Sequence, residues 1–236
     1  MPAYNAEKTL QKTYKDIDKK IVRKIILVDD GSCDNTIKLA KKLGITVFWH
    51  PNNLGYGGNQ KTCYWEALKF KPDVVVMIHP DYQYDATLIE ELVRPILQKR
   101  YDMMFGSRIR TRAEALNGGM PPIKYFFNRL YTLMANPILG VNFSEHMSGM
   151  RAYSGKTLRK VPFQRFSNDF VFDQEFTIAA INKGLKIGEI AIPVRFYEES
   201  SSISMLPGLK FGFGSLYILG LYILNQAGIY KHKIFR

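Results

Sequence analysis

The chain has 236 residues, 46% of them hydrophobic, which is enough for one sizeable α/β domain with an additional module. A formal net charge of +12 favours anionic partners such as nucleotide diphosphates, lipid phosphates or anionic membrane surfaces, with a solvated basic face as the alternative. The basic residues are scattered without a nucleic-acid-binding motif, so we expect no nucleic acid partner. Cys33 and Cys63 lack metal-ligand spacing and are typical of free thiols in a cytosolic protein.

Strand and helix signals alternate from the first residue to about residue 105. Short apolar runs indicate buried strands, and the amphipathic segments between them indicate helices. The expected strands are 24–29, 45–49, 73–78 and 103–105, and the expected helices are 6–17, 35–43, 59–70 and 87–98. This alternation predicts an α/β fold with a mostly parallel sheet and helices on both faces.

The pattern becomes irregular over residues 106–170, where only a long helix near 123–139 is expected. Regularity returns with a helix over 173–183 and a strand over 185–193. No internal repeat or low-complexity tract is present in the sequence.

The C-terminal segment 211–230 carries no charge and is strongly apolar over 216–224. Four glycines and two amides interrupt it, so it is a poor match to the roughly 20 apolar residues of a membrane-spanning helix. Its aromatic residues and the basic end over 231–236 predict a helix at a membrane interface, with packing on the domain or on a dimer partner as the alternative. We therefore divide the chain into a domain of residues 1–205 and a C-terminal helix and basic tail of residues 206–236.

The apolar run Ile25–Val28 ends in the segment 29–36, with the sequence Asp-Asp-Gly-Ser-Cys-Asp-Asn-Thr. This order predicts a buried parallel strand, a tight turn and a helix, and ligands of open α/β sheets bind at the carboxyl ends of strands. Asp34 is equally well explained as a helix cap. The pattern resembles family 2 glycosyltransferases, the group that includes the dolichol- and polyprenyl-phosphate sugar synthases. The resemblance covers about residues 1–205 and implies a GT-A, Rossmann-like fold.

The first seven residues look like the segment that follows the first strand in this family. We therefore expect that the chain is truncated or starts late, with its first strand missing or only a stub. The resemblance implies that the turn and the acidic pair hold the nucleoside. The residues assigned to this role are Pro2, Ala3, Tyr4, Glu7, Asp29 and Asp30.

The glycine-rich segment 52–61 resembles a further turn of the family. Glycine lets a backbone approach a ligand, and a helix N-terminus suits phosphate. Gly58 and Lys61 are therefore expected near the donor diphosphate, although Lys61 is also compatible with a solvated surface position.

Segment 79–85 follows a predicted strand at the place of the family's Asp-x-Asp metal motif. The first aspartate is replaced by His79, whereas Asp81 and Gln83 match the polyprenyl-phosphate branch. Hard divalent cations prefer oxygen ligands. The resemblance therefore implies a Mg²⁺ or Mn²⁺ cofactor at Asp81, with His79 either a second ligand or part of the pocket lining.

Three arginines and one serine match positions that the lipid-phosphate branch uses near phosphates. Arg108 ends a strand in Gly-Ser-Arg and is assigned to the nucleotide sugar, with a surface salt bridge as the alternative. Arg151 lies in Ser-Gly-Met-Arg-Ala-Tyr and either holds phosphate or braces the acceptor loop. Arg195 and Ser202 are assigned to a phosphate of the donor or acceptor, although the lysine expected after the serines is missing.

Asp173 and Glu175 open a predicted helix at the position of the family's catalytic acidic motif. Inverting transfer needs a base near the acceptor hydroxyl, and Asp173 is the first choice. If the acceptor is an ionised lipid phosphate, the carboxylate only orients groups. A helix N-terminal acid favoured by the helix dipole is the structural alternative.

The sequence thus predicts an inverting, metal-assisted hexosyltransferase that uses a UDP- or GDP-linked sugar. The expected acceptor is a lipid phosphate or a cell-envelope glycan, and the expected location is cytoplasmic and peripheral at the inner face of the membrane. Two alternatives stay open: a soluble transferase acting on a saccharide, and an inactive nucleotide-binding or membrane-scaffold protein. A homo-oligomer paired through the C-terminal helix is also compatible with the sequence.

Overall fold

The computed structural model describes residues 1–193 and 205–236, and within these ranges the chain forms two sheets. The first sheet has the parallel order β1-β2-β3, and the second has the order β4-β6-β5-β7. The strands are β1 (Pro2–Ala3), β2 (Ile26–Asp29), β3 (Thr46–Trp49), β4 (Val74–Met77), β5 (Met103–Ser107), β6 (Arg151–Ser154) and β7 (Ile187–Ala191). β5 and β7 pair in parallel, whereas β6 runs antiparallel to both of its neighbours. The predicted α/β fold is confirmed, with β6 as the strand that the sequence reading missed.

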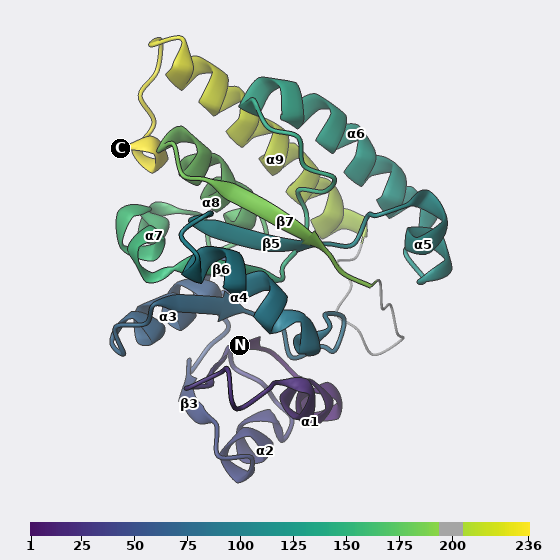
Figure 1. Ribbon diagram of the computed structural model, residues 1–236, viewed down its shortest axis with the longest axis vertical. Coiled ribbons are helices and arrows are strands. Elements are labelled where there is room, and N and C mark those ends of the chain that lie inside the picture. The colour runs from purple at the N-terminus through teal and green to yellow at the C-terminus, as the bar shows by residue number, and fades with distance from the viewer. Residues whose placement is uncertain (194–204) are drawn as a thin grey trace.

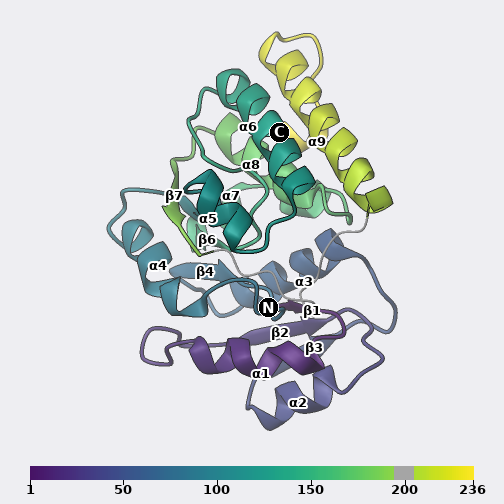
Figure 2. The ribbon, with the colours of Figure 1, turned by 90° about the vertical axis from the view of Figure 1, so that its right-hand side faces the viewer.

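The helices cover both sheets, as Figures 1 and 2 show. They are α1 (Glu7–Asp16), α2 (Thr36–Lys42), α3 (Tyr56–Leu68), α4 (Ile89–Leu97), α5 (Arg112–Asn117), α6 (Pro122–Leu139), α7 (Gly155–Lys160), α8 (Phe172–Asn182) and α9 (Met205–Gln226). Short 3₁₀ turns lie at η1 (Ala86–Leu88), η2 (Phe163–Arg165) and η3 (Lys233–Phe235). The expected helices are confirmed to within a few residues, but α5 and α7 were not expected.

Two hydrophobic cores lie on the two faces of the strand layer, because successive strand residues point to opposite sides. Leu27 and Met104 belong to the core beneath α1, α2 and α4, whereas their neighbours Val28 and Met103 belong to the core beneath α3, α6, α8 and α9. Each core therefore contains residues from both sheets. The two sheets are joined through their side chains rather than through a continuous hydrogen-bonded ladder.

The N-terminus occupies the edge of the first sheet. The Met1 ammonium group donates to the Ile26 carbonyl at 2.9 Å, and Pro2 and Ala3 pair with Val28 and Asp29. A two-residue strand therefore stands where the sequence predicted a missing or stub-like first strand. It brings the backbone of Ala3 beside Asp29.

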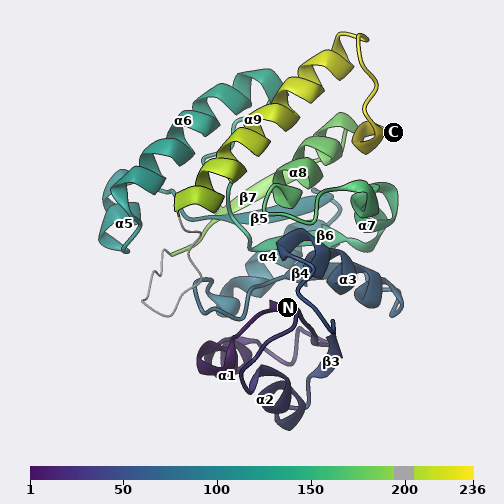
Figure 3. The same ribbon diagram turned by 180° about the vertical axis from the view of Figure 1, so that it is seen from behind.

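The C-terminal segment returns to the body of the protein after α9. Ile218 and Tyr222 of α9 are buried in the core that contains α8, and so are Ile234 and Phe235 of the final turn. Figure 3 shows α9 lying along α6 and over α8, with the C-terminus brought back beside α8. The division of the chain at residue 205 remains a prediction.

Candidate active site

The carboxyl end of β2 carries the two aspartates of the first motif, and both are buried. Asp29 Oδ2 accepts from the Ser32 amide at 2.9 Å across a turn in which Gly31 has a φ of +79°, a conformation that favours glycine. The other oxygen, Asp29 Oδ1, is buried without a hydrogen-bond partner. A buried carboxylate oxygen left unsatisfied is costly, so it is a marker for a missing donor.

Asp30 has a different environment. Its Oδ1 accepts from His50 Nδ1 at 2.7 Å and from the Leu54 amide at 2.9 Å, and its Oδ2 accepts from the Gly55 amide at 3.0 Å. These contacts fix the glycine-rich loop against β2. The contacts described here are internal to the protein, and a role for Asp30 in nucleotide binding stays a prediction.

The remaining N-terminal candidates surround the same strand end. Pro2 and Ala3 are buried, whereas the Tyr4 side chain is exposed. The carboxylate of Glu7 accepts from the backbone and the side chain of Asn35, so it fastens α1 to the start of α2. Asp34 accepts from the backbone and the hydroxyl of Thr36 and from the Glu7 amide, whereas the N-cap position of α2 is occupied by Asn35, so the prediction that Asp34 caps the helix is not met by its position.

Helix α3 begins at Tyr56, inside the segment expected to be a loop up to Asn59. The glycines permit a close approach of protein to protein: the Gly57 amide donates to the Asn168 carbonyl at 2.8 Å, and a Cβ on Gly57 would overlap the Ser167 carbonyl oxygen. Gly58 also contacts Asn168, and the Lys61 ammonium group bonds to the Phe166 carbonyl and to Asn168 Oδ1. The first turns of α3 are thereby locked to the loop that precedes α8.

Three side chains on these turns line the strand ends, and sequence reasoning assigned no role to them. Asn59 Nδ2 donates to the Ala3 carbonyl at 3.3 Å, while Asn59 Oδ1 is buried without a partner. Tyr56 and Gln60 instead reach Asp173 at the start of α8. Helix α3 therefore joins the Ala3–Asp29 region to Asp173.

Asp173 is held by a set of donors. The Tyr56 hydroxyl donates to its Oδ2 at 2.6 Å, Gln60 Nε2 donates to its Oδ1 at 3.2 Å, and Arg151 Nε lies 3.8 Å from Oδ1. Burial, together with the nearby Asp173 carboxylate, raises the pKa of Tyr56 well above its usual value. The tyrosine therefore stays protonated and acts as a donor to Asp173.

His79 lies against Tyr56, with ring centroids 5.3 Å apart and planes 18° apart, and its Nε2 is 3.2 Å from the Tyr56 hydroxyl oxygen. Since the single hydroxyl proton of Tyr56 goes to Asp173, His79 Nε2 carries a proton and donates to that oxygen. Burial lowers the pKa of His79, which favours the neutral imidazole with a bare Nδ1. In this arrangement Nε2 is unsuited to bind a metal, and metal ligation by His79 stays a prediction.

Asp81 follows β4, and its Oδ1 accepts from the Gln83 amide at 3.1 Å. The part of the chain that the structure describes contains no group of three or more His, Cys, Asp or Glu side chains arranged to hold a metal ion. Asp81 supplies one hard oxygen ligand, which fits a cation that takes its other ligands from a diphosphate and water. The side chains present thus fit a metal ion that binds together with the diphosphate of a substrate. They fit a metal site formed by protein ligands alone less well.

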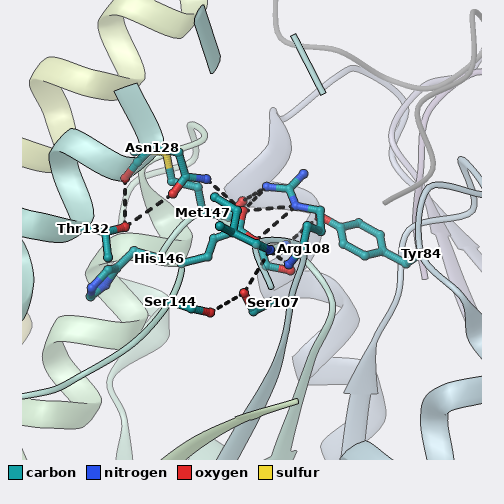
Figure 4. Close-up of polar contacts among 12 residues, drawn as sticks. Tyr84, Ser107, Arg108, Asn128, Thr132, Ser144, His146 and Met147 are labelled. Carbon is teal, nitrogen blue, oxygen red and sulfur yellow. Dashed lines mark hydrogen bonds and ion pairs between the residues drawn. The ribbon is translucent and has the colours of Figure 1, made fainter. Parts of the chain in front are cut away.

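Arg108, at the end of β5, forms a buried salt bridge with Glu145, a residue to which sequence reasoning assigned no role (Figure 4). Its backbone amide donates to Glu145 Oε2 at 2.7 Å, and its guanidinium also donates to the Met147 carbonyl at 2.9 Å. Asn128 Nδ2 donates to Glu145 Oε1 at 2.9 Å. The Arg108–Glu145 salt bridge is therefore part of a buried hydrogen-bond network. It is not the surface salt bridge that was the alternative to a nucleotide-sugar contact for Arg108.

Arg151 is 1% exposed, and its guanidinium donates to groups on two segments. It bonds to the carbonyls of Ser148 and Asp173 and to the Thr177 hydroxyl, at 2.8, 3.1 and 2.7 Å. These contacts brace the loop before β6 against α8, and a contact of Arg151 with phosphate stays a prediction.

Glu175 accepts from the Ser167 amide at 2.6 Å, and burial raises the pKa of Glu175. Arg195 and Ser202 lie outside the described residues.

The fold is shared with a solved glycosyltransferase. The structure of glucosyl-3-phosphoglycerate synthase from Mycobacterium tuberculosis, in complex with Mn²⁺, uridine diphosphate and glucosyl-3-phosphoglycerate, aligns with a TM-score of 0.69 at 22% identity. The alignment covers 98% of this chain and 79% of that one. This likeness shows that the chain has the GT-A fold.

The family model described as glycosyl transferase family 2 matches residues 1–161, and the chain belongs to this family. It is 34% identical to the uncharacterized protein MJ1222 of Methanocaldococcus jannaschii, over 90% of this chain and 88% of that protein. It is 28% identical to UDP-N-acetylglucosamine–dolichyl-phosphate N-acetylglucosaminyltransferase of Methanococcus voltae, over 85% of this chain and 86% of that enzyme. The protein is therefore a glycosyltransferase, and relatives of it are dolichyl-phosphate sugar transferases.

Proposed function

We propose that this protein is an inverting transferase that moves a sugar from a UDP- or GDP-linked donor to a lipid phosphate at the cytoplasmic face of a membrane. The observation that carries the proposal is a pair of buried, unsatisfied acceptors on either side of Ala3. They are Asp29 Oδ1 and Asn59 Oδ1. Uracil and guanine both present ring N–H donors, so either base satisfies an acceptor of this kind.

The side chains that follow β4 and open α8 provide the reaction half of the site. Asp81 would hold a Mg²⁺ or Mn²⁺ ion, which when bound neutralises charge that develops on the diphosphate leaving group. The acceptor oxygen attacks the anomeric carbon as the bond from that carbon to the diphosphate oxygen breaks, and the configuration inverts. The nucleoside diphosphate leaves with the electron pair of the broken bond.

Asp173 has two possible duties in that displacement. A sugar hydroxyl acceptor must lose a proton, and Asp173 would take it. An ionised lipid phosphate brings no such proton, and Asp173, held by Tyr56, Gln60 and Arg151, would then orient groups around the reacting carbon. The lipid-phosphate acceptor is supported by the relative that acts on dolichyl phosphate and by the basic charge of the chain.

Calorimetric titration with UDP and GDP, each with and without Mn²⁺, tests the donor site. We expect one nucleotide to bind more tightly with Mn²⁺, Asp81→Ala to remove the Mn²⁺ dependence, and Asp29→Asn to weaken binding in both conditions. Trp65→Glu, on the exposed face of α3, is the matched control and should bind as the unaltered protein does. Failure of both nucleotides to bind would overturn the proposal and would favour the alternative of an inactive scaffold protein. The replacement of the first aspartate of the metal motif by His79 is the sequence feature behind that alternative.

A further inference from the structure

Helix α6 presents apolar side chains on its outer face as well as on the face that packs on the core, where Tyr131, Ala135 and Leu139 are buried. It buries Asn128 and Thr132, which bond within the protein, and it exposes a run of large apolar side chains. The exposed residues are Ile123, Phe126, Phe127, Leu130, Leu133, Met134 and Ile138. Their spacing of three and four residues forms one continuous stripe along the helix.

Helix α9 contacts α6 and exposes a second set of large apolar side chains. They are Leu209, Phe213, Leu216, Tyr217, Ile223 and Leu224, followed by Ile229 and Tyr230. The two helices lie side by side at the end of the molecule opposite α1 and α2 (Figures 1 and 3). An apolar surface of this extent marks an interaction site. We call the exposed side chains of α6, α9 and residues 227–230 the α6–α9 surface.

The charges on these segments are of one sign. Helix α6 and residues 205–236 contain six basic residues and no Asp or Glu. Lys210, Lys231, Lys233 and Arg236 are exposed. Apolar side chains combined with exposed basic residues are complementary to an anionic lipid surface, in which aromatic rings enter the interface and lysines meet headgroups.

Both ends of α9 are fastened to the same side of the protein. Near its start, Lys210 forms a 2.5 Å salt bridge with Asp169, and at its end Asn225 and Gln226 bond to Asn182 of α8 at 3.1 and 3.0 Å. Residues 207–226 are long and apolar enough to cross a membrane by length and composition, and 28% of an 18-residue apolar window within them is buried inside the protein. The chain then returns to bury Ile234 and Phe235 against the domain. A helix tethered at both ends to one domain lies along a bilayer surface rather than through it.

We propose that the α6–α9 surface docks onto an anionic bilayer, with α9 lying in the plane of the membrane. The proposal deepens the proposed function, because it places the site beside the lipid in which a lipid-phosphate acceptor resides. Asp169 and Val171, which contact α9 through Lys210 and Gly214, come just before Asp173. Membrane docking therefore brings the start of α8 close to the headgroup layer.

Co-sedimentation with vesicles tests the surface. The full chain should bind vesicles of phosphatidylcholine and phosphatidylglycerol, and bind pure phosphatidylcholine at least about tenfold more weakly. Leu133→Glu on α6 and Phe213→Glu on α9, at positions 66% and 70% exposed, should each weaken binding at least about tenfold. Trp65→Glu, at a position 56% exposed on α3, is the matched control and should leave binding unchanged. Equal binding by all four proteins would overturn the proposal.

Two further measurements separate the alternatives. Washing with sodium carbonate should release the bound protein if α9 lies in the plane, whereas retention means that α9 crosses the bilayer and contradicts the proposal. Sedimentation velocity without lipid should give the same species for the unaltered protein and Phe213→Glu. A dimer that Phe213→Glu dissociates, without vesicle binding, would assign the surface to a second copy instead. UDP and GDP titration of these variants reports on the donor site alone, so failure of membrane docking is distinguishable from failure of the proposed function.

Discussion

The hydroxyl of Tyr56 donates a 2.6 Å hydrogen bond to the carboxylate of Asp173, which lies 117 positions later in the chain. The same tyrosine contacts His79, which follows β4. Through these two contacts Tyr56 connects the start of α8 to the end of a strand of the second sheet. Asp173 is thus held in one orientation before any acceptor arrives. Under the proposed function, this fixed orientation of Asp173 contributes to the rate of transfer.

The two acidic residues of the α8 motif should differ in importance. We expect Asp173→Asn to reduce transferase activity at least about a hundredfold, because the proposed function assigns its carboxylate to proton removal or to orienting groups at the reacting carbon. Glu175→Gln should retain most of the activity, because Glu175 accepts from the Ser167 amide and the amide oxygen of Gln can do the same. Initial rates with a saturating sugar donor would decide, and equal losses in both variants would contradict the assignment.

Removal of the Tyr56 hydroxyl should act on turnover rather than on donor binding. Tyr56→Phe leaves Asp173 with the donors from Gln60 and Arg151 but frees its Oδ2. We expect kcat to fall about tenfold while the Kd for the nucleotide changes little. The two constants should be measured on the same preparation. A weakened Kd with an unchanged kcat would place Tyr56 in the donor pocket instead.

Breaking the Glu145 salt bridge should cost far more stability than breaking a surface pair. Glu145→Ala leaves the buried Arg108 guanidinium without its anion, a change that typically costs about 3–5 kcal/mol. Glu90→Ala removes the exposed Arg94 pair on α4 and should cost less than about 1 kcal/mol. Urea denaturation of both variants gives the comparison, and similar midpoints would contradict the buried network.

His146 should make the protein less stable in mild acid. Its Nε2 donates to Asn136 Oδ1 at 2.9 Å, its Nδ1 is buried without a partner, and burial lowers the pKa of His146 to about 4. The unfolded chain binds this proton at the ordinary pKa of about 6.5, so stability contributed above that pH is lost as the pH falls towards 4. The loss is on the order of 3 kcal/mol. His146→Gln should flatten the free energy of unfolding over this interval, and an unchanged profile would contradict the expectation.

The crowded glycine at the start of α3 should be intolerant of substitution. A Cβ on Gly57 would overlap the Ser167 carbonyl oxygen and lie 2.8 Å from Phe172 Cβ, so Gly57→Ala should destabilise the fold and displace α8. Gly220 is also helical but has open space around its Cβ position, so Gly220→Ala should be neutral or stabilise by up to about 1 kcal/mol. Thermal unfolding midpoints would show the contrast, and matching midpoints would refute it.

Local patterns predicted most of the fold, because the strands and helices of the first half carry clear periodicity. Strand β6 was missed because Arg151–Ser154 is only four residues long and begins with an arginine, which does not resemble a buried strand. The early start of α3 was missed because two glycines usually weaken a helix. Here the contact of Gly57 with Asn168, far along the chain, decides the conformation.

The candidate site could be predicted only as far as its residues lie in local motifs. Asp29 ends a recognisable strand, Asp81 follows one and Asp173 opens a recognisable helix, and their roles stay predictions. Tyr56 and Gln60 gain their importance from contacts with a residue more than a hundred positions away, and Glu145 from a contact 37 positions away. The periodicity of apolar residues within a short stretch of sequence cannot predict contacts between residues so far apart in the chain.

The sharing of both cores between the two sheets has a practical consequence for dividing the protein. A fragment ending after β5 would contain Asp29 and Asp30 but would expose Val28, Met77 and Met103, whose apolar partners on α8 and α9 would be gone. We expect such a fragment to aggregate, and we expect the intact chain to unfold in a single cooperative transition. The N-terminal and C-terminal halves of the chain therefore cannot be exchanged as modules between relatives, and chimeras would have to replace individual loops.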